Sequence, residues 1–442
     1  MDKFFKITER GSSVRTEIVG GVTTFFAMAY IIFVNPGMLS ATGMDFNGVL
    51  LATCISAAIG CFLTALLANA PFAQAPGMGL NAFFTYTVCF NMGYTWQEAL
   101  AIVLLSGILF LIIAVSPLRS KIISSIPAFL KSAISAGIGL FIAFIGILNV
   151  GLVGFGSGVP ALQFMVADDA GNMVANTAGI LALIGLLITA ILMAYKVKGA
   201  IVIGIIVTAI IGFPMGETVL PESITLAGVS LSSVAFKLDI PGVFAKGILP
   251  LVTAVISFAL VDCFDTVGTL IGTAKNAGMT DRHGNLPGGD RALIADAVAT
   301  CCGACLGTST VTTFVESSTG ISEGARTGLS SVVVGVLFLV ACLLAPVAKI
   351  IPSAATAPAL IIVGVLMIKG ATEVNWSDFE EACPAFLTIA MMPFAYSISD
   401  GIGFGFISYS VIKLARGKAK DVPLLVYIIS VLFILKYILT SV

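Results

Sequence analysis

Apolar segments follow one another along almost the whole chain, and each is long enough to cross a lipid bilayer as a helix. The sequence has 442 residues, of which 58% are hydrophobic and 10% are charged, and its mean hydropathy is +1.09. A spanning helix needs about 20 mostly apolar residues, and an ordinary water-soluble domain does not contain segments of this kind throughout its length. The sequence therefore predicts an all-α polytopic membrane protein.

Fourteen segments meet this length requirement. The predicted spans are residues 17–39, 48–69, 76–92, 97–116, 128–148, 178–195, 199–215, 247–272, 291–308, 313–328, 329–349, 353–370, 382–397 and 400–416. A further apolar stretch, 423–441, remains as either an interfacial helix or a fifteenth span. The connections between the spans are too short for a second soluble domain, so the chain forms one membrane domain.

The distribution of basic residues predicts the orientation of these spans. If Met1 is cytoplasmic and the spans alternate, all but four of the 22 lysines and arginines fall on the cytoplasmic side. Lys237, Lys246 and Lys349 fall outside, and Lys436 lies in the remaining apolar stretch. This bias is the positive-inside pattern of a multi-pass plasma-membrane protein with a cytoplasmic N-terminus. A net charge of -1 gives no reason to expect a nucleic-acid partner.

Two predicted spans contain segments that disfavour a regular helix. The third contains QAPGMGLNAFF at 74–84, where Pro76 and Gly77 break the helix, and the tenth contains STVTTFVESSTG at 309–320, with β-branched residues around Thr312. Non-helical backbone at membrane depth is tolerated only where it lines a cavity or is buried in protein. Interruptions at corresponding places in two halves predict two inverted seven-span repeats, with a binding site at the midplane.

Acidic residues occur within these segments. In ISFALVDCFDTVGTLIG, Asp262 and Asp265 are three residues apart and share one helix face, and Glu316 lies beside the second break. An unpaired carboxylate is costly in the membrane. Because two neighbouring carboxylates cannot both remain ionised comfortably in a medium of low dielectric constant, we expect one of them to hold a proton. A group that gains and loses a proton within the membrane suits coupling to a proton gradient.

The other residues expected at the site are polar or aromatic and carry no positive charge: Gln74, Asn81, Thr266, Thr269, Tyr30, Phe83, Phe264 and Phe314. This set disfavours an anionic substrate and suits a small, flat, neutral molecule with N–H donors and ring acceptors. Asp296, Glu323 and Asp400 are expected near span ends, as ordinary interfacial groups. Cys301, Cys302 and Cys305 have no histidine nearby and are expected to pack between helices, so neither a metal site nor a cofactor is predicted.

The three motifs, together with the opening ERGSSVRTEIVGGVTTFFAMAYIIFVNP, resemble the AzgA-like purine branch of the nucleobase-cation symporter family 2, within the xanthine/uracil permease superfamily. The resemblance extends over essentially the whole chain. It implies a proton symporter of adenine, guanine or hypoxanthine that works by alternating access and is often homodimeric. It also implies fourteen spans in two inverted sevens, with short strands in the broken third and tenth spans.

The resemblance also implies domains and site residues. A core domain would comprise residues 1–127 and 243–350, and a gate domain residues 128–242 and 351–442. The residues expected to contact the purine nucleobase are Glu316, Asp262, Asn81 and Ala82, with the neighbouring Phe264, Val315 and Thr266. Those expected to couple the proton are Asp262, Asp265 and Glu316. Among these, Glu316 would be the substrate anchor.

Several alternatives remain open at this point. Sodium could replace the proton as the coupling ion, the substrate could be xanthine or uracil, and the preferred purine is undetermined. An intramembrane aspartyl protease would need acids from two helices in motifs that this chain lacks, since GIGFGF at 401–406 contains no acid. A channel is disfavoured because paired broken helices suit occlusion better than a continuous pore. The sequence therefore predicts a transporter and not an enzyme.

Overall fold

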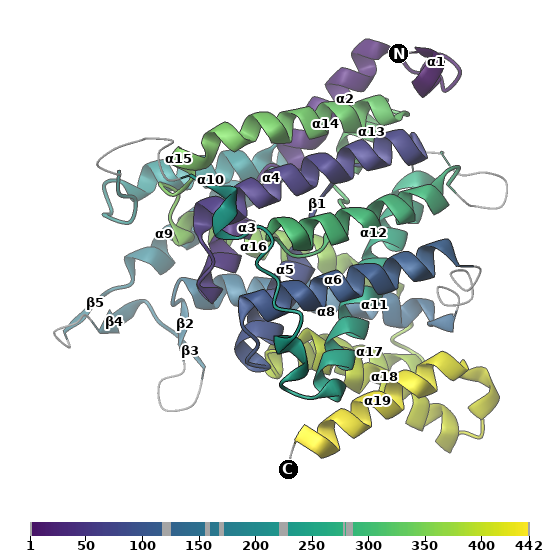
Figure 1. Ribbon diagram of the computed structural model, residues 1–442. Coiled ribbons are helices and arrows are strands. Elements are labelled where there is room, and N and C mark those ends of the chain that lie inside the picture. The colour runs from purple at the N-terminus through teal and green to yellow at the C-terminus, as the bar shows by residue number, and fades with distance from the viewer. Residues whose placement is uncertain are drawn as a thin grey trace.

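The computed structural model of the chain is a bundle of helices, many of which run side by side across the molecule (Figure 1). It describes residues 2–116, 125–154, 160–167, 172–220, 229–276, 279 and 286–440, so His283, the single histidine, lies outside the described residues. Within the described part, eight helical stretches are long and apolar enough to cross a membrane. The predicted helical class is therefore confirmed, whereas the fourteen-span count and the inverted repeats remain predictions.

The helices of the first half are α1 (Asp2–Phe5), α2 (Val14–Met28), α3 (Ile31–Leu39), α4 (Phe46–Leu63), α5 (Met78–Ala82), α6 (Trp96–Val115), α8 (Ala128–Asn149), α9 (Thr177–Ala194) and α10 (Ala200–Gly212). Those of the second half are α11 (Ile248–Asn276), α12 (Gly289–Leu306), α13 (Ser317–Ser322), α14 (Gly328–Ala341), α15 (Ala345–Ala348), α16 (Ser353–Met367), α17 (Phe379–Phe394), α18 (Ile398–Ala415) and α19 (Leu424–Thr440). Two π-helical segments, η2 (Thr64–Ala68) and η3 (Phe83–Asn91), extend α4 and α5.

Two short strands lie at the centre of the fold, one from each half of the sequence. β1 (Gln74–Pro76) pairs antiparallel with β6 (Val311–Thr313), so that Gln74 lies opposite Thr313 and Pro76 opposite Val311. Both strands are completely buried. The predicted short strands are confirmed, and each lies at or before the start of its predicted range, 76–92 or 313–328. These two ranges remain predictions as membrane spans.

The remaining strands form two small hairpins in the connection between α8 and α9. β2 (Val153–Gly154) pairs with β3 (Ala161–Leu162), and β4 (Met165–Ala167) pairs with β5 (Met173–Ala175). The described side chains of β2, β3 and β5 are partly or fully exposed. They lie away from the central strand pair and do not contribute to the site (Figure 1).

The helices pack closely through small residues. A Cβ atom on Gly364 of α16 would lie 2.4 Å from the backbone oxygen of Gly139 in α8, and one on Gly107 of α6 would lie 2.9 Å from the Cys301 sulfur of α12. Small residues permit this close approach of helix backbones. α8 also packs against α17, and α6 against α11. The division of the chain into core and gate domains stays a prediction.

The C-terminal helix α19 runs antiparallel to α18 along its length (Figure 1). Lys436 Nζ lies 2.7 Å from Asp400 Oδ1 near one end, and the hydroxyls of Ser410 and Ser430 are 2.9 Å apart nearer the other. An interfacial helix would cross the bundle helices instead of following one of them. This arrangement favours the fifteenth-span alternative for residues 423–441, a placement that remains a prediction.

Candidate functional site

A fully buried carboxylate, Asp296 of α12, ties the central strand pair to the helix that carries the predicted acids. Its Oδ1 accepts hydrogen bonds from Gln74 Nε2 at 3.1 Å and Thr313 Oγ1 at 3.2 Å, and its Oδ2 accepts one from Thr266 Oγ1 at 2.9 Å. Gln74 and Thr313 are opposite each other in β1 and β6, and Thr266 belongs to α11. Asp296 is therefore wrongly predicted as an interfacial residue, and its place in this cluster is one that the sequence interpretation missed.

Asp262 of α11 belongs to the same buried layer. It is 1% exposed, and the Thr300 hydroxyl lies 3.0 Å from its Oδ2 and 3.0 Å from the backbone oxygen of Val311. The hydroxyls of Thr266 and Thr312 are 2.7 Å apart, which adds a second link between α11 and β6. Hydroxyl and amide donors thus contact both carboxylates beneath the strand pair, and among the described residues Asp262 Oδ1 is left without a hydrogen-bond partner. Buried polar groups need such partners because leaving them unsatisfied is costly.

Glu316 and Asp265 form a second layer that is only partly buried. Glu316 Oε1 accepts a hydrogen bond of 2.7 Å from the Tyr30 hydroxyl, and Asp265 lies close enough to interact electrostatically with Glu316. The Phe314 ring lies 6.5 Å from the Tyr30 ring, centroid to centroid. Val315 is 57% exposed, so its side chain points away from the buried layer. The structure therefore brings Asp265 of α11 and Glu316 of the predicted tenth span close together, with two aromatic rings beside them.

The remaining predicted site residues are buried around the strand pair. Asn81 Oδ1 accepts a hydrogen bond from the Ser309 hydroxyl, so the amide links the segments that flank β1 and β6. Ala82 is fully buried, and Phe264 is 7% exposed. Lys131 of α8 places its ammonium group 5.8 Å from the centre of the Phe264 ring, which brings a cation to the edge of a site that the sequence predicts to be free of positive charge.

Two acids expected near span ends form ion pairs. Asp400 pairs with Lys436, and Glu323 pairs with Lys198 at 2.7 Å. No ion pair in the described part of the chain involves Asp262, Asp265, Asp296 or Glu316. Asp262, Asp296 and Glu316 are thus held by neutral donors, in contrast to the acids near the helix ends.

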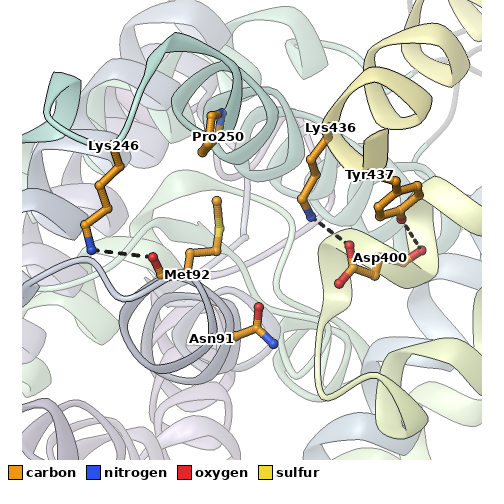
Figure 2. A pocket seen from close by; sticks show the side chains of 7 residues that line it. All are labelled: Asn91, Met92, Lys246, Pro250, Asp400, Lys436 and Tyr437. Carbon is orange, nitrogen blue, oxygen red and sulfur yellow. Dashed lines mark hydrogen bonds and ion pairs between the residues drawn. The ribbon is translucent and has the colours of Figure 1, made fainter. Parts of the chain in front are cut away.

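Figure 2 shows a pocket that is distinct from this cluster. Its volume is about 360 Å³, and it is lined by Asn91, Met92, Lys246, Pro250, Asp400, Lys436 and Tyr437. These residues lie in or directly beside the end of η3, the start of α11, the start of α18 and the last turns of α19. None of the predicted site residues lines this pocket. The chemistry-bearing residues around β1 and β6 therefore define the candidate site.

A helical membrane protein whose two broken helices meet beside buried acids has the architecture of a secondary transporter. The fold is similar to that of the transmembrane domain of the cyanobacterial bicarbonate transporter BicA, with a TM-score of 0.65 and 15% identity over 87% of this chain and 97% of that one. At this level of identity the likeness concerns the fold alone.

The family follows from the sequence comparison. The model of the permease family (Xan_ur_permease) matches residues 15–404, and the chain belongs to this family. It is 41% identical to the adenine permease AdeP of Escherichia coli, over 99% of this chain and 96% of that protein. It is also 41% identical to the guanine/hypoxanthine permease PbuG of Bacillus subtilis, over 99% of each chain. These relatives are permeases and not enzymes.

Proposed function

We propose that this protein imports purine nucleobases across the plasma membrane by proton symport, through alternating access of one central site. The family and the substrates named for its relatives support a purine as the transported molecule. The N-terminus would be cytoplasmic, the gate domain would move against the core domain, and the protein would act as a monomer or a homodimer.

The observation that carries this proposal is the pair of partly buried acids, Glu316 and Asp265, beside the Tyr30 and Phe314 rings. A carboxylate accepts hydrogen bonds from the ring or exocyclic N–H groups of a purine, and an aromatic ring offers a surface for stacking. Because no lysine or arginine in the described part of the chain forms an ion pair with either acid, a proton is the natural partner for their charge.

Each predicted site residue has a role in this proposal. Glu316 anchors the base and Asp262 contributes to its binding, while Asp262 and Asp265 hold and release the coupled proton. The residues that complete the substrate site are Asn81, Ala82, Phe264, Val315 and Thr266. The rearrangement that opens the site would give the base access to the buried ones, since Asn81, Ala82 and Thr266 have no exposed surface in this structure.

Uptake into proteoliposomes tests the proposal. The assay follows radiolabelled hypoxanthine, guanine and adenine under an inward pH gradient, with the wild type, Glu316→Gln and the control Glu9→Gln. Glu9 is an exposed acid that pairs with Lys6. We expect saturable uptake by the wild type and the control, abolished by a protonophore and unaffected by replacing sodium with choline, and none by Glu316→Gln.

Other outcomes would contradict separate parts of the proposal. Uptake that needs a sodium gradient and survives the protonophore would show that sodium, and not the proton, is the coupling ion. Stronger uptake of xanthine or uracil than of any purine tested would change the substrate. Equal uptake by Glu316→Gln and the wild type would show that Glu316 does not anchor the substrate.

A further inference from the structure

We infer that Tyr30 is a positioning residue for the substrate anchor: its hydroxyl holds the Glu316 carboxylate in one orientation and so sets the affinity for the base. The inference rests on the proposed function and assigns a role to a residue of the first predicted span. Tyr30 acts through Glu316, and its contribution is to binding and not to movement of the carrier.

The first observation is the position of Tyr30. It lies in the break between α2 and α3, is 1% exposed, and donates its hydroxyl proton to Glu316 Oε1 across 2.7 Å. A hydrogen bond to an ionised carboxylate is shorter and stronger than one between neutral groups. Since Glu316 itself is only partly buried, this bond restrains a side chain that is otherwise open to motion on one side.

The second observation is that the helices on either side of this bond cannot shift easily. α2 and α13 run antiparallel, and a Cβ atom on Gly320 would lie 2.3 Å from the backbone oxygen of Gly20, so the two backbones are in direct contact. At the far end of α2, Glu17 Oε1 accepts a hydrogen bond of 2.8 Å from the backbone N–H of Arg326. These two contacts hold α2 against the segment that carries Glu316, and so they fix the position of the Tyr30 hydroxyl relative to the carboxylate.

The physical consequence is preorganisation. A glutamate side chain that is free to change rotamer loses conformational entropy when it binds a ligand. When the tyrosine already fixes the carboxylate, this loss is smaller and the base binds more tightly. Removing the hydroxyl while keeping the ring would therefore weaken binding, leave the packing against Phe314 in place, and leave the transport rate at saturating substrate largely unchanged.

Equilibrium binding and transport of Tyr30→Phe test the inference. The dissociation constants of radiolabelled hypoxanthine, guanine and adenine are measured on full-length protein in lipid nanodiscs, and the maximal uptake rate is measured in proteoliposomes. Tyr94→Phe is the matched control, because the Tyr94 hydroxyl is buried and has no hydrogen-bond partner in the described part of the chain. We expect Tyr30→Phe to raise the dissociation constant about tenfold, or ~1.4 kcal/mol, with the maximal rate and melting temperature close to those of the control.

Each other outcome counts against the inference. A dissociation constant of Tyr30→Phe within about twofold of the control, which is ~0.4 kcal/mol, would overturn it, as would a lowered maximal rate with unchanged affinity, which would indicate a role in carrier movement. If Tyr30→Phe is not recovered folded, 3-fluorotyrosine at position 30 keeps the ring and strengthens the donor, and an unchanged dissociation constant would refute the assignment. Absence of purine binding by the wild type would overturn the proposed function together with this inference.

Discussion

Removal of the Asp296 carboxylate is expected to destabilise the central strand pair and to abolish transport. Asp296 accepts hydrogen bonds from Gln74, Thr313 and Thr266. In Asp296→Ala, the Thr266 hydroxyl still has the Thr312 hydroxyl 2.7 Å away, whereas Thr313 loses its acceptor and Gln74 Nε2 keeps only the Thr313 hydroxyl at the long distance of 3.5 Å. An unsatisfied buried donor costs roughly 1–3 kcal/mol, so two of them cost about 2–6 kcal/mol.

Asp296→Asn separates the loss of charge from the loss of all acceptors. The asparagine keeps one carbonyl oxygen, so one of the orphaned donors remains satisfied and the cost falls to about 1–3 kcal/mol. We therefore expect the melting temperatures in detergent to rank wild type above Asp296→Asn, and Asp296→Asn above Asp296→Ala. Because Gln74 and Thr313 lie in the two strands of the site, we also expect purine uptake to fall in the same order.

Asp421→Ala provides the control for both measurements, since Asp421 is an exposed aspartate far from the strand pair in the chain. Melting curves are read by size-exclusion chromatography after heating, and uptake is measured in proteoliposomes with equal amounts of folded protein. The reasoning is refuted if Asp296→Ala matches Asp421→Ala in both melting temperature and uptake, because three hydrogen bonds to a buried carboxylate would then contribute nothing.

Three further predictions concern other parts of the molecule. Gly320→Ala places a Cβ atom 2.3 Å from a backbone oxygen of α2, so it should lower the melting temperature and weaken purine binding, whereas Gly37→Ala, which meets no atom within 4 Å, should do neither. If α19 follows α18 across the bilayer, a C-terminal epitope tag should be labelled by antibody on intact spheroplasts; labelling only after permeabilisation would contradict this topology. Hydrogen bonds from Lys413 and Lys418 lower the pKa of Glu380 from 4.5 to about 2, so the stability that they provide is present above pH 4.5 and is lost as the pH falls toward 2. The difference in melting temperature between the wild type and Glu380→Gln should therefore be constant from neutral pH down to about 4.5 and then shrink; a difference that shrinks already near neutral pH would contradict the assignment.

The two breaks in the helical pattern could be predicted from local chemistry, but the pairing of the strands found there could not. Proline lacks an N–H group and β-branched threonines favour extended backbone, so Pro76 and Thr312 mark both breaks in the sequence. The register that places Gln74 opposite Thr313, 239 residues away, depends on how the helices on either side pack. No periodicity within one segment carries that information.

Asp296 shows why part of the site could not be read from the sequence. Its position near the start of the predicted span 291–308 indicates an interfacial residue. In the structure α12 begins at Gly289, so Asp296 lies two turns into the helix and faces the strand pair. Gln74, which the sequence analysis assigns to the substrate site, gives the stronger indication of a buried acid. A buried amide beside two threonines requires a buried acceptor, and Asp296 is that acceptor.

The two layers of acids have different tolerances to change, and this difference follows from their partners. Asp262 and Asp296 satisfy donors from β1, β6, α11 and α12 at once, so altering either disturbs the frame that holds the strands. Glu316 has the single side-chain partner Tyr30 among the hydrogen bonds of the described residues, and Asp265 meets it through charge alone. If these acids bind the base as proposed, substitutions in the outer layer should change ligand affinity without unfolding the strand pair, whereas substitutions in the buried layer should alter affinity and stability together. Substrate preference among related permeases should accordingly be determined by residues around Glu316, where a substitution lowers the stability of the fold least.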